Sequence, residues 1–208
     1  MVRVKICGIT NLEDALLAEK FGADAVGFIF TQKSPRYIKP VSAKKIVSSL
    51  GPFISKVGVF MNQKKEKVLE IASCLGLDTL QFHGKESVSY CSFFKPRFKV
   101  IKVCFPGDSA ESISRYQNLD VLMFDIPYHQ KNKKKKTLPV KFIQSIKKEI
   151  KDGKKIIFSG GLNPDNVANI VKFSPYGVDV ASGVEELVGE KDKNAMKQFI
   201  ERAKNVLS

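Results

Sequence analysis

Two residues that could move a proton stand at the ends of apolar runs in this chain. Cys7 follows the run Val2–Ile6 and precedes Gly8, and Asp125 follows the run Val121–Phe124. A thiolate can act as a base and a carboxyl group as a proton donor, so the two could form an acid–base pair. Taken singly, each has a plainer interpretation: a small buried side chain for the cysteine and a turn-forming residue for the aspartate.

Two glycine turns follow later apolar runs and have the composition of anion-binding sites. Ser159-Gly160-Gly161 leads into Asn163-Pro164, a helix cap followed by proline at the first helical position. Ala181-Ser182-Gly183 forms the second turn. Glycines let backbone N–H groups converge on an anion, and a helix N-terminus adds positive potential. The predicted phosphate-binding residues are therefore Gly160, Gly161, Ser182 and Gly183, although such glycines can also serve only to make tight turns.

Four further polar residues stand beside predicted strand ends. Arg36 in Ser34-Pro35-Arg36-Tyr37 could hold a carboxylate or phosphate through two parallel hydrogen bonds. Gln81 and Asp179 suit binding of hydroxyl or amine groups, and His83 could be an acid–base group or a substrate donor. The alternatives are a surface cation for Arg36 and structural hydrogen bonding for the other three.

Short β-rich runs alternate with helical patterns along the whole chain. The predicted strands are Val2–Ile6, Ala25–Phe30, Ser55–Phe60, Thr79–Phe82, Lys99–Val103, Val121–Phe124, Ile156–Phe158 and Val178–Val180. The predicted helices are Leu12–Phe21, Ser42–Leu50, Lys64–Leu75, Glu86–Phe94, Ala110–Tyr116, Val140–Ile150, Pro164–Phe173 and Asn194–Leu207.

Eight strand–helix units in 208 residues leave about 26 residues for each, which suits a parallel sheet with short loops. An open doubly wound sheet usually has Gly-x-Gly-x-x-Gly after its first strand, and this chain has Cys7-Gly8-Ile9-Thr10 there. The prediction is therefore an α/β chain folded as one (β/α)8 (TIM) barrel domain over residues 1–208. In such a barrel the polar strand ends share one pocket.

Composition narrows the class of protein further. The hydrophobic fraction is 43%, and we expect a cytoplasmic protein with neither a secretory signal nor a transmembrane helix. The four cysteines form no Cys-x-x-Cys pair, which indicates neither zinc nor a disulfide framework. The net charge of +14 comes mostly from lysine, whereas base readout favours arginine, so nucleic-acid binding is not favoured.

A lysine-dense segment runs from Tyr128 to Pro139 and contains Lys131 and Lys133–Lys136. Its polar composition predicts a solvated loop whose like charges repel one another. Two sharper interpretations are a lid that attracts an anionic substrate and a nucleic-acid patch. No aromatic residues alternate with the lysines, so stacking on bases is not supported.

Together these motifs resemble one family, phosphoribosylanthranilate isomerase, a (β/α)8 enzyme of tryptophan biosynthesis. The resemblance is carried, in order along the chain, by Lys5–Thr10, Gly22–Phe28, Ser34–Tyr37, Gln81–Gly84, Ser159–Pro164 and Gly177–Glu185. It implies an Amadori rearrangement of N-(5-phosphoribosyl)anthranilate with no cofactor and no metal. It also implies a phosphorylated small-molecule substrate as the partner. We expect a monomer or a homodimer.

By the family's pattern, Asp125 would be the general acid that opens the furanose ring and Cys7 the general base at C2. Arg36 would hold the anthranilate carboxylate, and Asp179 would lie near the ribose hydroxyls. The glycine turns would hold the phosphate.

Two departures from the family's pattern leave alternatives open. The lysine run replaces a Gly-Gly-Thr-Gly-like stretch after Asp125, and Ala181 replaces a serine. One alternative is therefore the same isomerisation of another N-(5-phosphoribosyl)amine, such as a ribosylamino-pyrimidine of pterin or riboflavin synthesis. Another, drawn from the net charge and the lysine run, is a non-catalytic basic binding module.

Overall fold

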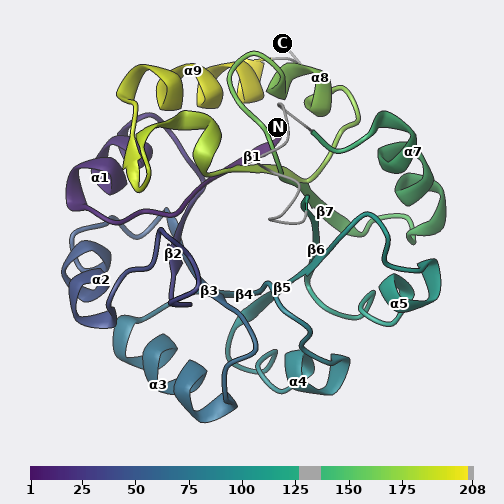
Figure 1. Cartoon of the computed structure of the whole chain (residues 1–208), viewed down its shortest axis with the longest axis horizontal. Coiled ribbons are helices and arrows are strands. Elements are labelled where there is room, and N and C mark those ends of the chain that lie inside the picture. The colour runs from purple at the N-terminus through teal and green to yellow at the C-terminus, as the bar shows by residue number, and fades with distance from the viewer. Residues whose placement is uncertain (127–136, 206–208) are drawn as a thin grey trace.

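The chain forms a closed barrel of eight parallel strands with helices around the outside (Figure 1). The computed structural model describes residues 1–126 and 137–205. The strands pair in sequence order, and β8 pairs with β1 to close the ring. Their bounds are β1 Arg3–Cys7, β2 Ala25–Ile29, β3 Ser55–Phe60, β4 Thr79–Phe82, β5 Lys99–Cys104, β6 Val121–Phe124, β7 Lys155–Phe158 and β8 Gly177–Val180. The predicted (β/α)8 barrel is confirmed.

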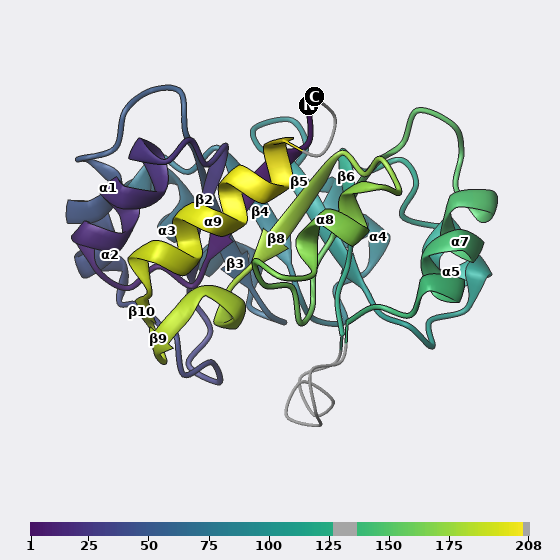
Figure 2. The ribbon, with the colours of Figure 1, turned by 90° about the horizontal axis from the view of Figure 1, so that it is seen from above.

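The helices form an outer ring, and α9 lies between α1 and α8, where it contacts both (Figures 1 and 2). Their bounds are α1 Leu12–Lys20, α2 Pro40–Val47, α3 Lys65–Leu75, α4 Val88–Ser92, α5 Ala110–Ser114, α7 Val140–Glu149, α8 Val167–Val171 and α9 Lys193–Lys204. Side chains cap several of them: Asn11 accepts from the N–H of Asp14, and Asp192 from that of Ala195.

The alternation of side chains along each strand separates two apolar clusters. Residues such as Val4, Ile6 and Phe124 pack outward against the helices in the main core. A smaller cluster occupies the opposite side of the strands and comprises Val57, Ile101, Val103, Val121, Met123 and Ile157. Since neighbouring strand residues point to opposite faces, this second cluster fills the barrel interior. Lys5 and Cys7 alternate with Val4 and Ile6, so they also face inward.

The structure differs from the sequence prediction mainly at element boundaries. Regular α8 begins at Val167 rather than Pro164, yet the predicted cap is formed, since Asn163 Oδ1 accepts from the N–H groups of Asp165 and Asn166. The segment after β8 contains a hairpin that was not predicted, made of β9 (Glu185–Leu187) and β10 (Glu190–Lys191). Both strands are too short to show an alternating pattern.

A repeated clamp joins neighbouring strands at the amino ends of the barrel. An aspartate directly precedes each of β2, β4 and β6 and accepts an N–H bond from the strand before it. The acceptors are Asp24, Asp78 and Asp120, the donors Val4, Lys56 and Val100. A basic side chain pairs with each acceptor: Arg3, Lys56 and Lys99. Before β8 the same place holds Tyr176, with Lys155 Nζ 5.0 Å from the centre of its ring.

The predicted lysine loop lies mostly outside the described residues, because residues 127–136 are not part of them. Within the described ranges, no helix has both the length and the apolar character needed to cross a bilayer. All four cysteines are free thiols; Cys7, Cys91 and Cys104 are buried and Cys74 is exposed.

Candidate functional site

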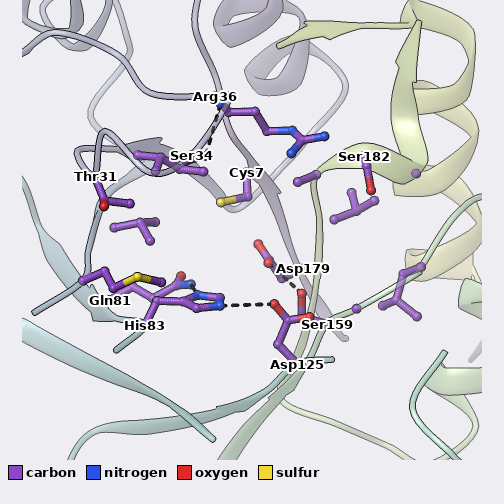
Figure 3. A pocket seen from close by; sticks show the side chains of 18 of the residues that line it. Cys7, Thr31, Ser34, Arg36, Gln81, His83, Asp125, Ser159, Asp179 and Ser182 are labelled. Atoms are coloured by element: carbon purple, nitrogen blue, oxygen red, sulfur yellow. Dashed lines mark hydrogen bonds and ion pairs between the residues drawn. The ribbon is translucent and has the colours of Figure 1, made fainter. Parts of the chain in front are cut away.

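A cavity of about 420 Å³ opens at the carboxyl ends of the strands (Figure 3). Six strands, β1, β2, β4, β6, β7 and β8, supply polar or reactive side chains or glycines at their ends or in the loops that follow. The ends of β3 and β5 supply apolar side chains: Val59, Met61 and Phe105. The structure brings all ten predicted site residues to this cavity: Cys7, Arg36, Gln81, His83, Asp125, Gly160, Gly161, Asp179, Ser182 and Gly183. The predicted gathering of strand ends around one pocket therefore holds.

The carboxyl group of Asp125 is held from two sides at the end of β6. Its Oδ1 accepts the N–H of Ile126 at 2.7 Å, and its Oδ2 lies 3.5 Å from Nε2 of His83. The side chain is 3% exposed. A methyl group on Gly160 would lie 2.7 Å from Oδ1, so the absence of a side chain there makes room for the carboxyl group. Asp125 is thus fixed at the cavity wall beside a histidine and a glycine turn.

Cys7 lies in the middle of the site, between Arg36 and the His83–Asp125 pair (Figure 3). Burial raises the pKa of the Cys7 thiol, while the Lys5 ammonium beside it acts in the opposite direction and does not fully offset it. The thiol form is therefore favoured at neutral pH, and the thiolate depends on nearby cations.

Lys5 and Asp179 form a buried ion pair below Cys7. Lys5 Nζ lies 2.7 Å from Asp179 Oδ1, and the two side chains are 4% and 7% exposed. Ser159 donates its hydroxyl to Asp179 Oδ2 at 3.0 Å. Burial is the largest single influence and lowers the pKa of Lys5, but the charges of Asp179 and Cys7 and the hydrogen bonds to them together outweigh it and raise that pKa above its usual value. Lys5 therefore stays charged inside the barrel.

Arg36 is oriented by Glu185, which belongs to the unpredicted hairpin. Nε and Nη2 of Arg36 donate to the two carboxylate oxygens at 2.7 and 2.6 Å, a bidentate pair. Lys191 Nζ donates to Glu185 at 2.8 Å and to the carbonyl of Ala181 at 3.1 Å. Burial raises the pKa of Glu185, but bonds from Arg36 and Lys191 outweigh burial and lower it overall. The hairpin thus fixes a cation at the cavity rim.

The two glycine turns touch each other beside the cavity. A methyl group on Gly183 would overlap the carbonyl of Leu162, which follows Gly161. Gly160 and Gly161 have φ values of +86° and +67°, which side chains rarely adopt. Asn166 Nδ2 donates to the carbonyl of Gly161 at 3.0 Å and braces the first turn. The turns therefore form one continuous lining, as an anion held between them would require.

Gln81 brings an acceptor to the cavity that the described part of the chain does not satisfy. Its side chain is buried, and its Nε2 lies 3.4 Å from Nδ1 of His83. Its Oε1 is buried without a donor among the described residues. A buried amide oxygen without a donor is costly, and a ligand hydroxyl or amine can supply one.

Three residues that support the site were not among the predicted ones: Lys5, Glu185 and Lys191. Lys5 could have been found, since it stands two residues before Cys7 and shares its face of the strand. Glu185 lies 149 residues from Arg36 in sequence, so only the closed barrel reveals their pairing. Lys191 gave no signal, because lysine is usually exposed.

Fold and site together define a (β/α)8-barrel protein whose carboxyl, thiol and cationic side chains and glycine turns meet at the carboxyl ends of its strands, where enzymes with this fold have their active sites. Residues 4–202 match the family model described as N-(5'phosphoribosyl)anthranilate (PRA) isomerase. A relative of that name from Thermotoga petrophila is 42% identical over 99% of this chain and its own full length.

Solved structures agree. Phosphoribosyl anthranilate isomerase from Thermotoga maritima is 41% identical, with a TM-score of 0.87 over 98% of this chain and 99% of that one. A phosphoribosyl anthranilate isomerase in complex with reduced 1-(o-carboxyphenylamino)-1-deoxyribulose 5-phosphate is 40% identical, with a TM-score of 0.83 over the same shares. The chain belongs to the N-(5'-phosphoribosyl)anthranilate isomerase family. It is an isomerase of tryptophan biosynthesis, which sets aside the interpretation as a non-catalytic binding module.

Proposed function

We propose that this isomerase rearranges N-(5'-phosphoribosyl)anthranilate to 1-(2-carboxyphenylamino)-1-deoxyribulose 5-phosphate, with Asp125 as acid and Cys7 as base. The observation that carries the proposal is that both side chains line one cavity, from β6 and β1, beside the touching glycine turns. The complex of a 40% identical isomerase with a reduced form of this product supports the choice of substrate.

In the first step Asp125 gives its proton to the furanose ring oxygen. The bond from C1 to that oxygen breaks, and the amine nitrogen supplies the electron pair that forms a Schiff base at C1. The Nε2 of His83 and the N–H of Ile126 hold the carboxyl group in place during this transfer. A positioned acid of this kind contributes about 10²- to 10⁴-fold in rate.

In the second step Cys7, as thiolate, removes the proton from C2. The electrons of that C–H bond form a double bond between C2 and C1, and the cationic Schiff base becomes a neutral enolamine. Tautomerisation then places a proton on C1 and a carbonyl at C2. The net reaction is an internal oxidation of C2 and reduction of C1, so it needs no external oxidant or reductant.

Binding groups around the cavity fit the same substrate. Arg36, oriented by Glu185, would hold the anthranilate carboxylate. The buried Oε1 of Gln81, which has no donor within residues 1–126 and 137–205, would accept from a ribose hydroxyl or the amine. Asp179 would lie near the ribose hydroxyls. Gly160, Gly161, Ser182 and Gly183 would hold the phosphate through their N–H groups.

The test follows the fluorescence of the anthranilate group as purified enzyme consumes the substrate. We expect turnover by the wild type, and a fall of about 10²- to 10⁴-fold in kcat for Cys7→Ala and for Asp125→Asn. Asp120→Asn, at the opposite end of β6, is the matched control and should leave kcat unchanged. Wild-type activity in Cys7→Ala or Asp125→Asn would refute the assigned roles.

Comparing kcat/KM for the two substrates tests the alternative, another N-(5-phosphoribosyl)amine. The anthranilate substrate should have the higher kcat/KM, and Arg36→Met should reduce that advantage because the carboxylate loses its partner. A higher kcat/KM for an N-(5-phosphoribosyl)amine without the carboxylate would show that this amine, not the anthranilate compound, is the preferred substrate.

A further inference from the structure

Charged groups surround the Cys7 thiol. Lys5 faces it from β1, Asp179 from β8 and Lys191 from β10. Across the cavity stand His83, Asp125 and Arg36. Since burial disfavours the thiolate, Cys7 can act as a base only if one of these groups stabilises the ionised sulfur.

The geometry singles out Lys5. Gly27 of β2 lies beside both side chains: a methyl group placed on it would be 2.8 Å from the Cys7 sulfur and 2.9 Å from Nζ of Lys5. The sulfur and the ammonium therefore occupy neighbouring positions over a residue that has no side chain. Three N–H donors on the ammonium allow it to serve the sulfur while one remains on Asp179.

Asp179 and Ser159 hold the ammonium in that position. The Lys5–Asp179 distance is 2.7 Å, and Asp179 in turn accepts the hydroxyl of Ser159. Lys5 pairs across the β1–β8 seam in direct register with Asp179, so the backbone fixes their separation. Since both side chains are almost fully buried, the surrounding dielectric is low and the charge of Lys5 acts strongly on its neighbours.

We propose that Lys5 is a positioning residue for the isomerisation, which stabilises the Cys7 thiolate and holds it toward the cavity, with Asp179 as the opposing charge that sets how much thiolate forms. The inference rests on the proposed role of Cys7 as the base. It predicts effects of opposite sign from the two members of one ion pair: loss of Lys5 withdraws thiolate, and loss of the Asp179 charge favours it.

The experiment measures alkylation of Cys7 by iodoacetamide as a function of pH, with the Cys7 peptide quantified by mass spectrometry. Only the thiolate reacts, so the midpoint reports ionisation without turnover. In Lys5→Met the midpoint should move up by about one to three pH units, because an opposite charge in contact is lost. In Asp179→Asn it should move down. In Lys5→Met the rising limb of the pH dependence of kcat/KM should shift to higher pH by the same amount as the alkylation midpoint. The variant should lower kcat more than it changes KM.

A matched control accounts for the loss of a buried ion pair. Lys102 of β5 pairs with Glu86 at 3.3 Å, the two side chains are 4% and 2% exposed, and neither lines the cavity. Lys102→Met should lower the melting temperature as Lys5→Met does, yet leave the Cys7 midpoint where it is.

The outcomes separate this inference from the proposed function. An unchanged Cys7 midpoint in Lys5→Met, or an unchanged or raised midpoint in Asp179→Asn, would overturn it, and the second variant keeps the test decisive if Lys5→Met does not fold. Full activity in Cys7→Ala would instead refute the role of Cys7 as the base, whatever the alkylation midpoints show.

Discussion

The two ends of the barrel carry ion pairs of different design. At the amino ends the aspartate clamp recurs before β2, β4 and β6, and each pair has one member open to solvent: Arg3 is 62% exposed, Lys99 76%, and Asp78, the partner of Lys56, 50%. At the carboxyl ends the pairs occur once each and are buried. Lys5–Asp179, Arg36–Glu185 and Lys191–Glu185 all have carboxylates no more than 7% exposed.

This difference indicates which charged pairs are structural and which belong to a site. A clamp repeated at equivalent places joins strand to strand and depends on a backbone N–H more than on charge. A pair that occurs once and is buried requires two charges to leave water, which is often no more stable than apolar packing. Such a pair at a cavity is therefore better explained by what it presents to a ligand. Variants at the two ends test this distinction.

The largest effect is expected at Glu185. Glu185→Gln leaves Arg36 and the fully buried Lys191 without their shared carboxylate, and breaking a buried pair from one side costs about 3–5 kcal/mol. Chemical denaturation at neutral pH measures the loss, and KM should rise because Arg36 is no longer oriented. A loss below about 1 kcal/mol, typical of an exposed pair, would contradict the comparison.

The acid dependence of Glu185 has a defined sign. Because its pKa is lowered in the folded protein, the carboxylate stabilises the fold fully above the unfolded value of about 4.3. That contribution is lost as pH falls through the lowered folded pKa. The stability difference between wild type and Glu185→Gln should therefore be greatest near neutrality and shrink in acid. A difference that grows as pH falls would contradict this assignment.

A second variant tests the contact between the first glycine turn and Asp125, the proposed acid. In Gly160→Ala the new methyl group would lie 2.7 Å from Asp125 Oδ1 and from the Ile126 nitrogen, so the carboxyl group must move. Misplacement of a catalytic group by about 1 Å can reduce the rate about 10²-fold, and kcat should fall by that order.

Gly153→Ala is the control for Gly160→Ala. Gly153 has a φ of +78°, close to the +86° of Gly160, but a methyl group there meets nothing within 4 Å. Both variants carry similar backbone strain, so the melting temperatures should fall in both. Only Gly160→Ala should lose kcat, and an equal loss in Gly153→Ala would show that strain alone is responsible.

The same contrast explains what could be predicted from the sequence. Strand order and the cavity residues followed from apolar runs and from their polar ends, because parallel strands in a barrel must direct those ends to one face. Cys7 and Asp125 needed no knowledge of packing. Glu185 needed it, since its partner Arg36 lies far away in sequence and the hairpin that carries it is too short for a periodic signal.

The predicted start of the helix that follows β7 was wrong for a local reason. The predicted start at Pro164 was right about the cap, because Asn163 does accept two N–H bonds, but the chain makes a turn before the regular helix begins at Val167. Capping chemistry marks where a helical turn starts and does not specify how regular the next residues are. The lysine run, from which the alternative substrate was drawn, lies mostly outside the described residues.

The smallest effect is expected in the clamp at the amino ends. In Lys99→Met the charge lost is 76% exposed and 3.5 Å from Asp120, which keeps its bond from the N–H of Val100. Exposed pairs contribute about 0–1 kcal/mol, so the free energy of unfolding should change by no more than that, and less at high salt. The kinetic constants should match the wild type. A loss as large as that of Glu185→Gln would mean that the repeated clamps at the amino ends, like the single pairs at the site, depend on their charges.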